Sequence, residues 1–145
     1  MVSTTDEMLP ERTIVLDEII IASTRPERFT DLSFLKQPFK DSVELFLRDC
    51  EARGIHLMIV ETYRTPDRQD KMKKRGRSRL GADQSKHQHG LAIDVVPVIK
   101  GKMVWHNRKL WLKIGKLGEK RGLRWGGRWK NFVDYPHFEY KSINE

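Results

Sequence analysis

The stretch DQSKHQHGLAIDVV, Asp83–Val96, places two histidines, a glycine and an aspartate directly before and within an apolar run. The apolar residues from Leu91 onward predict a buried strand over Leu91–Val96. Side chains alternate along a strand, so Ala92 and Asp94 share one face while their neighbours take the other. Asp94 is therefore a carboxylate on an apolar strand, a costly position unless a positive group meets it.

Two histidines before this strand are candidates to meet Asp94. His87 lies seven positions earlier, and Gly90 allows the chain to bend so that the imidazole folds back over the start of the strand. His89 is the alternative ligand. Because it lies two residues closer to the glycine, it is also placed to shape the entrance to a site.

A second group of polar residues lies near the C-terminus. The segment His137–Tyr140 predicts a short strand with His137 and Glu139 on one face. If this strand pairs with the one that carries Asp94, then His87, Asp94 and His137 form a set of two histidines and one carboxylate. Such a set suits a catalytic zinc, which keeps a fourth position open for water.

A zinc site of this kind also needs a proton acceptor for the water whose pKa the metal lowers. Asp134 is the best placed candidate, because only Tyr135 and Pro136 separate it from His137 and the proline stiffens that link. The ordinary structural alternatives are that Asp94 pairs with an arginine and that His137 faces solvent on an edge strand.

The rest of the chain predicts a mixture of helices and strands with no repeating strand–helix unit. The expected elements are a helix from Ser42, capped by Asp41 or Ser42 and ended by Gly54, a strand over Ile55–Thr62, a hairpin over Val98–Val104 and a helix over Asn107–Arg121. This order favours the α+β class: a single small domain with a mainly antiparallel sheet flanked by helices.

The composition limits the partners and the metal chemistry. The chain has 145 residues, enough for one domain with a substantial core, and its single cysteine, Cys50, excludes an internal disulfide and every zinc site built on several cysteines. A net charge of +8 predicts attraction to a polyanion, such as nucleic acid, an anionic membrane surface or a wall polymer. The basic run Lys71–Arg79 is expected on a solvated helix end and loop.

The N-terminal part is the least patterned. We expect residues 1–30 to be a segment of uncertain role within the same domain as residues 31–145, with a loop over Thr24–Phe29. Acidic residues stand where a signal peptide would carry positive charge, so synthesis in the cytoplasm is expected. The longest apolar runs are too short to span a bilayer.

The ordered motifs resemble a known family. SKHQHGLAIDV, Ser85–Val95, followed by DYPHFE, Asp134–Glu139, resembles the zinc peptidases of bacterial cell walls: the VanY-type D-Ala-D-Ala carboxypeptidases and, more closely, the L-alanyl-D-glutamate endopeptidases that tailed phages use as endolysins. The family pattern is S-x-H-x-x-G-x-A-x-D, closed later by an acid and x-x-H. TYRTPDRQ, Thr62–Gln69, and GLRWGGRW, Gly122–Trp129, are similar to further family segments, so the resemblance covers about Leu32–Tyr140.

The resemblance implies a fold of the hedgehog/D-Ala-D-Ala peptidase type with its zinc site at the sheet. It implies one zinc ion per chain held by His87, Asp94 and His137, with Asp134 as general base. It also implies that Arg64 stabilises the oxyanion of the tetrahedral intermediate, a role that suits a guanidinium. A second ion, such as calcium, stays open.

Five further residues are expected to bind substrate or to support the ligands. Trp125 is expected to line the cleft together with Trp129, although tryptophans at this spacing are also common in a core. The set is Ser85, Gln69, His89, Trp125 and Glu139.

The resemblance also implies an activity. An aspartate before a Pro-His pair is similar to the endolysin subgroup, which predicts cleavage of the L-alanyl-D-glutamate bond in the peptidoglycan stem peptide. The alternative is a D-alanyl-D-alanine carboxypeptidase, which needs a cation for the free carboxylate of its substrate. A distant alternative is a nucleic-acid-binding module built on the basic runs and tryptophans.

The expected partner is bacterial peptidoglycan, reached by a monomer. The basic run Lys71–Arg79 is expected to hold teichoic acid or lipopolysaccharide, and no stable nucleic acid partner is expected. A phage lysis protein of this kind waits in the host cytoplasm and reaches the wall through a separate pore, a holin.

Overall fold

A computed structural model describes residues 28–76 and 86–142. Ser85, residues 77–79 of the predicted basic run and residues 1–27 of the predicted N-terminal segment lie outside the described residues. Among the helices that are described, none has the length and apolar character needed to cross a membrane.

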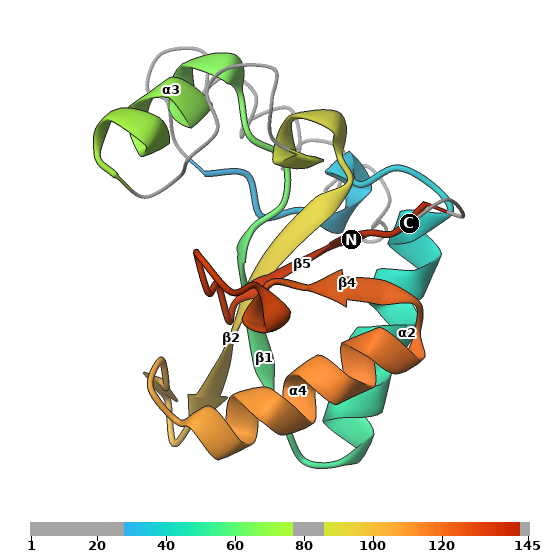
Figure 1. Ribbon diagram of the computed structural model, residues 1–145. Helices are drawn as coiled ribbons and strands as arrows, with labels where there is room; N and C mark the ends of the chain where they lie inside the picture. The colour runs from blue at the N-terminus through green and yellow to red at the C-terminus, as the bar shows by residue number, and fades with distance from the viewer. Residues whose placement is uncertain (1–27, 77–85, 143–145) are drawn as a thin grey trace, which may run out of the picture.

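The centre of the described structure is one antiparallel sheet (Figure 1). Its strands are β1 (Leu57–Glu61), β2 (Ala92–Ile99), β3 (Lys102–Met103), β4 (Leu123–Trp125) and β5 (His137–Tyr140). The order is β1-β2-β5-β4, and β3 pairs with the end of β2. The predicted α+β class with a mainly antiparallel sheet is therefore confirmed, and so is the hairpin predicted over Val98–Val104.

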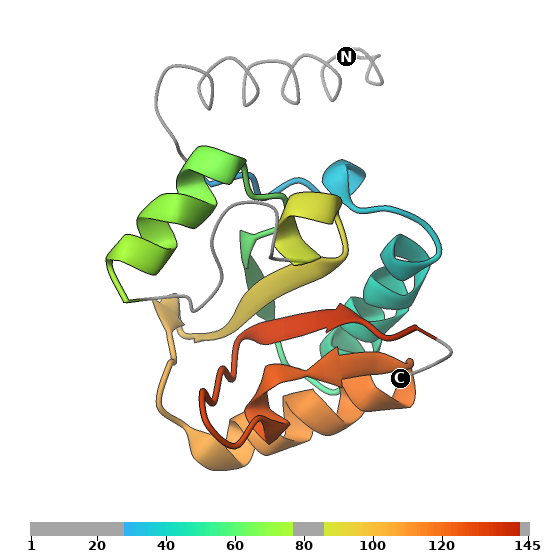
Figure 2. The ribbon, with the colours of Figure 1, turned by 45° about the horizontal axis from the view of Figure 1, so that its top comes forward.

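Helices cover the sheet. The described helices are η1 (Leu32–Phe34), α2 (Phe39–Ala52), α3 (Pro66–Lys74), η2 (Lys86–His89), α4 (Arg108–Lys120) and η3 (Gly126–Arg128). Figure 2 shows β2 and β5 between η2 above and α4 below. The core consists of side chains from α2, α4 and the inner face of the sheet, so the other face of β2 and β5 is left for polar residues.

The helix predicted from Ser42 begins earlier than expected. It starts at Phe39, whose side chain is buried in the core, and Asp41 lies in its first turn rather than at its cap. The side chain of Gln37 donates to Asp41 and accepts from the backbone N–H of Asp41, which stabilises this turn. The predicted end is correct, because Gly54 adopts a φ of 74°.

The helix predicted over Asn107–Arg121 is confirmed. The side chain of Asn107 accepts from the N–H of Leu110 at 3.0 Å and caps the helix. Two glycines inside the helix allow it to pack closely on the sheet. A Cβ on Gly115 would lie 2.3 Å from the Trp125 ring, and one on Gly118 would lie 2.5 Å from the Phe138 ring.

The alternation predicted for the two central strands is confirmed. Ile93 and Phe138 are fully buried in the core, while Asp94 and His137 lie on the opposite face. The short strand β4 was not predicted. It contributes only three residues, of which Leu123 and Trp125 are buried, and this alternation is too short to predict a strand.

The first described residues are packed against the end of β1. Phe29 is 3% exposed, and its ring lies 4.6 Å from the Phe34 ring and 5.4 Å from the Tyr63 ring. The carbonyl of Phe29 accepts from the N–H of Thr62 at 2.7 Å. This contact stabilises the segment after β1, from which the site is built.

The close packing of α4 gives a stability prediction. Gly115→Ala should lower the free energy of unfolding by about 1–3 kcal/mol, because the added methyl group collides with the Trp125 ring. Helix propensity alone would raise stability by about 1 kcal/mol. The measurement is denaturant unfolding, with exposed Lys116→Ala as the control. A Gly115→Ala protein more stable than wild type would contradict the packing described.

Candidate metal centre

Three side chains from three parts of the chain meet on the polar face of the sheet. Asp94 and His137 are direct partners across β2 and β5, and His87 reaches them from η2. One ligand atom from each of the three lies within 4.8 Å of the others. The strand pairing on which the predicted ligand set depended is therefore present.

His87 is held in one orientation. Its side chain is buried, and Nδ1 lies 2.8 Å from the carbonyl of Thr62, to which it donates. This bond leaves Nε2 as the nitrogen that faces Asp94 Oδ1, 3.2 Å away. Gly90 provides the turn behind it with a φ of 69°, and a Cβ there would lie 2.6 Å from the carbonyl of Phe34.

His137 is oriented through its other ring nitrogen, Nε2, whereas His87 is oriented through Nδ1. The Nε2 atom of His137 lies 2.8 Å from Glu139 Oε1 and its Nδ1 lies 3.1 Å from Asp94 Oδ1. Glu139 in turn is 3.2 Å from the ammonium of Lys86. Donation to Glu139 leaves Nδ1 of His137 as the nitrogen available to a metal.

The charges of the three residues are strongly coupled. Burial alone would raise the pKa of Asp94, but the charge of His87 and hydrogen bonds from both histidines hold it well below its usual value. Burial alone would lower the pKa of His137, but its hydrogen bonds to Asp94 and Glu139 raise it to about 10. Without a metal, the His137 ring is therefore protonated on both nitrogens and positively charged near neutral pH.

The donor set fits zinc. Two imidazole nitrogens and one carboxylate are the ligands of many catalytic zinc sites, which keep a fourth position open. The partners that fix each imidazole are those that metal-binding histidines commonly have: a backbone carbonyl for His87 and a carboxylate for His137.

Arg64 connects this centre to a buried ion-pair network. Its NH2 group lies 2.8 Å from Glu61 Oε1 and 3.5 Å from Asp94 Oδ2, and its NH1 group donates to Gln69 at 2.9 Å. Glu61 also accepts from Arg68 Nε at 3.1 Å. Glu61 is 2% exposed, and a carboxylate buried to this extent would be destabilising without the two arginines as partners.

A bulge in β1 explains why Glu61 lies there. Ile59 pairs with Val95, but Glu61 pairs with Asp94, so β1 has one extra residue at this point. Two carboxylates are thereby brought opposite each other, which is unfavourable unless a cation lies between them. The guanidinium of Arg64 fills that role.

Asp134 lies in the turn that leads into β5. Its carbonyl accepts from the N–H of His137 at 3.2 Å, and the carbonyl of Pro136 accepts from the N–H of Val95 at 3.0 Å. Burial and the charge of Asp94 raise the pKa of Asp134, and neighbouring positive charges oppose this in part. Within residues 28–76 and 86–142, no hydrogen bond reaches its carboxyl group. Its carboxyl group is therefore influenced by the charges of the ligand residues but has no hydrogen-bond partner in the described structure.

The two tryptophans differ in position. Trp125 is 3% exposed in the core, where its indole donates to the carbonyl of Tyr135 at 2.9 Å. It supports the turn that carries Asp134, and together with Trp129 it lines a pocket of about 440 Å³. The half-buried Trp129 is the one beside the ligands, with its ring 5.0 Å from that of His137.

The remaining predicted residues separate into two groups. Gln69 and Glu139 are buried beside the centre. Gln69 accepts a hydrogen bond from Arg64, and Glu139 accepts one from His137. His89 is exposed and does not belong to the ligand group, while Ser85 is outside the described residues. Sequence reasoning missed Glu61, whose position at the end of an apolar strand, three residues before Arg64, was the available signal.

Comparisons with known proteins agree with this geometry. Residues 79–140 match a family model described as D-alanyl-D-alanine carboxypeptidase. The peptidoglycan L-alanyl-D-glutamate endopeptidase CwlK of Bacillus subtilis (strain 168) is 34% identical over 103 residues, which cover 60% of this chain and 62% of CwlK. The L-alanyl-D-glutamate peptidase of Listeria phage A118 is 37% identical over 97 residues, which cover 63% of this chain and 34% of that protein. The chain thus spans less than two thirds of the length of either relative.

Solved structures have the same fold. The crystal structure of the Serratia marcescens L-Ala D-Glu endopeptidase ChiX matches with a TM-score of 0.66 and 25% identity, over 83% of this chain and 95% of ChiX. A vancomycin-resistance D,D-pentapeptidase VanY, solved with Zn(II), matches with a TM-score of 0.56 and 16% identity, over 76% of this chain and 74% of VanY. The resemblance predicted from the motifs is therefore confirmed: the chain is similar to D-alanyl-D-alanine carboxypeptidases over residues 79–140 and to L-alanyl-D-glutamate endopeptidases over a longer stretch.

Proposed function

We propose that the protein is a zinc-dependent peptidoglycan peptidase that cleaves the L-alanyl-D-glutamate bond of the stem peptide. One observation carries the proposal: His87, Asp94 and His137 converge, and each imidazole is turned by its own partner so that one nitrogen is available. The names of the two curated relatives and of ChiX support the choice of substrate.

A zinc ion held by these three residues would lower the pKa of a bound water and polarise the substrate carbonyl. Asp134 would accept the proton of the attacking water and pass it to the leaving amine. Two features of the chain suit Asp134 to this role. Its carboxyl is free of hydrogen bonds within the described residues, and its pKa is raised by burial and by Asp94, toward the range useful to a general base.

We propose that Arg64 acts on the developing charge of the carbonyl oxygen. Its guanidinium is 4% exposed and lies against Asp94, so its positive charge is little screened by water. The contact of NH2 with Asp94 is long, at 3.5 Å, whereas its contact with Glu61 is 2.8 Å. Because this contact with Asp94 is weak, NH2 could exchange it for a hydrogen bond to the substrate oxygen with little loss of hydrogen-bond energy.

The second candidate activity is removal of the terminal D-alanine, favoured by the description of the matching family model. A carboxypeptidase needs a cation for the free carboxylate of its substrate. Lys86, beside the centre, already has a carboxylate partner in Glu139. This pairing supports the endopeptidase over the carboxypeptidase.

The relative from Listeria phage A118 supports a role as a phage endolysin. We propose that the chain acts on peptidoglycan as a monomer, and that it reaches the wall from the cytoplasm through a separate pore. The catalytic domain is proposed to begin near residue 31, with Phe29 packed onto it.

The test of the proposed function is mass spectrometry of the peptides released from purified peptidoglycan, with and without a zinc chelator. Chelator-sensitive stem peptides that begin at D-glutamate are the expected product. Free D-alanine would instead establish the carboxypeptidase. Release of neither product by zinc-loaded protein from several wall types would overturn the proposal.

The assigned roles of Asp134 and His137 predict different losses. Asp134→Asn should keep the metal and lose about 10²–10⁴-fold in turnover, because the amide cannot accept the proton. His137→Ala should lose both the metal and turnover. The measurements are zinc content by elemental analysis and turnover on wall fragments. An active Asp134→Asn protein would rule out the base assignment.

The raised pKa of His137 predicts proton release when zinc binds. Because this pKa lies at about 10, the metal-free protein holds the proton at pH 7, and the metal must displace it. Affinity should therefore rise with pH up to that value. Calorimetric titration in buffers of different ionisation enthalpy measures the number of protons. The control protein with His56→Gln, at an exposed position, should release the same number of protons as wild type. A binding heat that does not depend on the buffer would contradict a protonated His137.

The buried network around Glu61 predicts a large loss of stability on neutralisation. Glu61→Gln should lower the free energy of unfolding by roughly 3–5 kcal/mol, because it leaves the charges of Arg64 and Arg68 without a carboxylate. The control is Glu51→Gln on the exposed surface, expected within about 0.5 kcal/mol of wild type. Equal losses in the two variants, measured by denaturant unfolding, would show that the network contributes nothing specific.

A further inference from the structure

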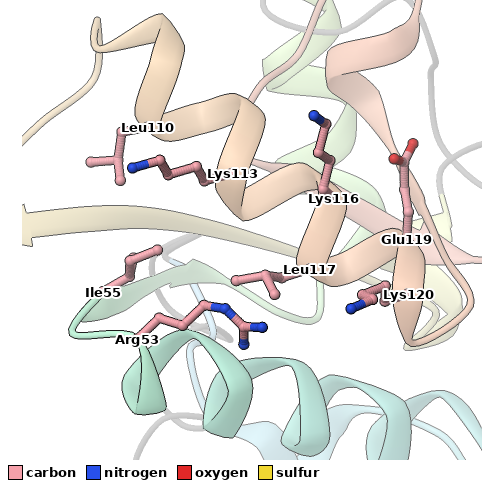
Figure 3. Close-up of a pocket in the computed structure, with 8 residues that line it drawn as sticks. All are labelled: Arg53, Ile55, Leu110, Lys113, Lys116, Leu117, Glu119 and Lys120. Atoms are coloured by element: carbon pink, nitrogen blue, oxygen red, sulfur yellow. The ribbon is translucent and has the colours of Figure 1, made fainter.

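A groove of about 830 Å³ lies between the C-terminal end of α2 and one side of α4 (Figure 3). Its floor is apolar and consists of Ile55, Leu110 and Leu117. Figure 3 shows Arg53 reaching in from the α2 side, opposite Lys113 and Lys120 on α4. The groove therefore has an apolar floor between two cationic walls.

The groove and the metal centre are on opposite sides of the sheet. Ile93 and Phe138 point into the core beneath α2 and α4, and Asp94 and His137 point the other way. No residue of the groove belongs to the ligand group or to the network around Glu61. The groove is thus not an extension of the proposed active site.

The lysines of α4 form a continuous stripe. Lys109, Lys113, Lys116 and Lys120 are four, three and four residues apart, so they lie on one side of the helix, and all four are exposed. Like charges at these spacings weaken a helix. No salt bridge in the described residues offsets this cost, although Lys120 interacts with the nearby carboxylate of Asp49 through its charge.

The nearby carboxylates are already committed to other cations. Asp49 accepts two hydrogen bonds from Arg121, and Glu119 accepts two from Arg128. In the part of the chain that the structure describes, no salt bridge involves Arg53 or any lysine of the stripe. The groove therefore keeps a positive potential that an external anion can neutralise.

We propose that this groove binds an anionic membrane phospholipid. Its phosphate would lie between Arg53 and the α4 lysines, since a guanidinium binds phosphate through two parallel hydrogen bonds. Its glycerol and the upper part of its acyl chains would cover the apolar floor. A free polyphosphate or a wall polymer would neutralise the same cations but would leave that floor in water, which is why the lipid fits better.

The proposal gives the protein an orientation. Seated on a membrane through α2 and α4, it holds the metal centre on the face directed away from the bilayer. If the proposed peptidase function is correct, that face is the one presented to the wall. This consequence rests on the proposed function, whereas lipid binding itself does not.

The first test is co-sedimentation of the full chain with vesicles of phosphatidylglycerol and phosphatidylcholine, against phosphatidylcholine alone. The groove variant carries Arg53→Gln, Lys113→Gln and Lys120→Gln, and the control removes the same charge elsewhere, with Lys71→Gln, Lys73→Gln and Lys102→Gln. The groove variant should bind the anionic vesicles at least about tenfold more weakly, and the control about twofold at most. Equal losses would show non-specific attraction and overturn the proposal.

The second test separates a lipid from a simple polyanion. Ile55→Asn should weaken binding to the anionic vesicles and leave binding of inorganic polyphosphate unchanged, because it alters only the floor; Leu110→Gln repeats the test if the first variant does not fold. Unchanged vesicle binding in a folded floor variant would contradict a lipid site. Cleavage of soluble wall fragments is measured in parallel, so loss of the proposed function and loss of lipid binding are distinguished.

Discussion

The pairing of Asp94 with His137 across β2 and β5 is the constraint on which the site depends. In this register Ile93 and Phe138 lie in the core, so Asp94 and His137 must lie together on the outer face. A shift of β2 by one residue would bury Asp94 and expose Ile93, which the core does not permit. The hydrophobic packing that specifies the sheet therefore also assembles the ligands.

Charge compensation makes this polar face tolerable. Asp94 lies against two imidazoles and Arg64, Glu61 is held by two arginines, and Glu139 lies between His137 and Lys86. Asp134 differs, because no hydrogen bond reaches its carboxyl in the described structure. The contrast separates the carboxylates that hold structure and ligands from Asp134, which is proposed as the general base. Asp94 and Arg64 belong both to these stabilising ion pairs and to the proposed active site.

Sequence reasoning succeeded where a periodicity extended over several residues or a motif fixed the spacing. The α4 helix and the outward face of Asp94 follow from such patterns, whereas the pairing with β5 was only a condition of the predicted ligand set and was established by the structure. The start of α2 did not, because Phe39 contributes to the core through tertiary contacts that no local pattern contains. The position of Glu61 depends on a bulge in β1, and the choice of His87 over His89 depends on a carbonyl from Thr62, which is distant in the sequence.

The central claim is that the fold turns two different imidazole nitrogens toward one metal. The most direct measurement is a crystal structure of the zinc-loaded protein with anomalous scattering at the zinc edge. We expect one ion bound by Nε2 of His87, Nδ1 of His137 and the carboxylate of Asp94. An ion bound through His89, through Nε2 of His137 or away from these residues would contradict the account.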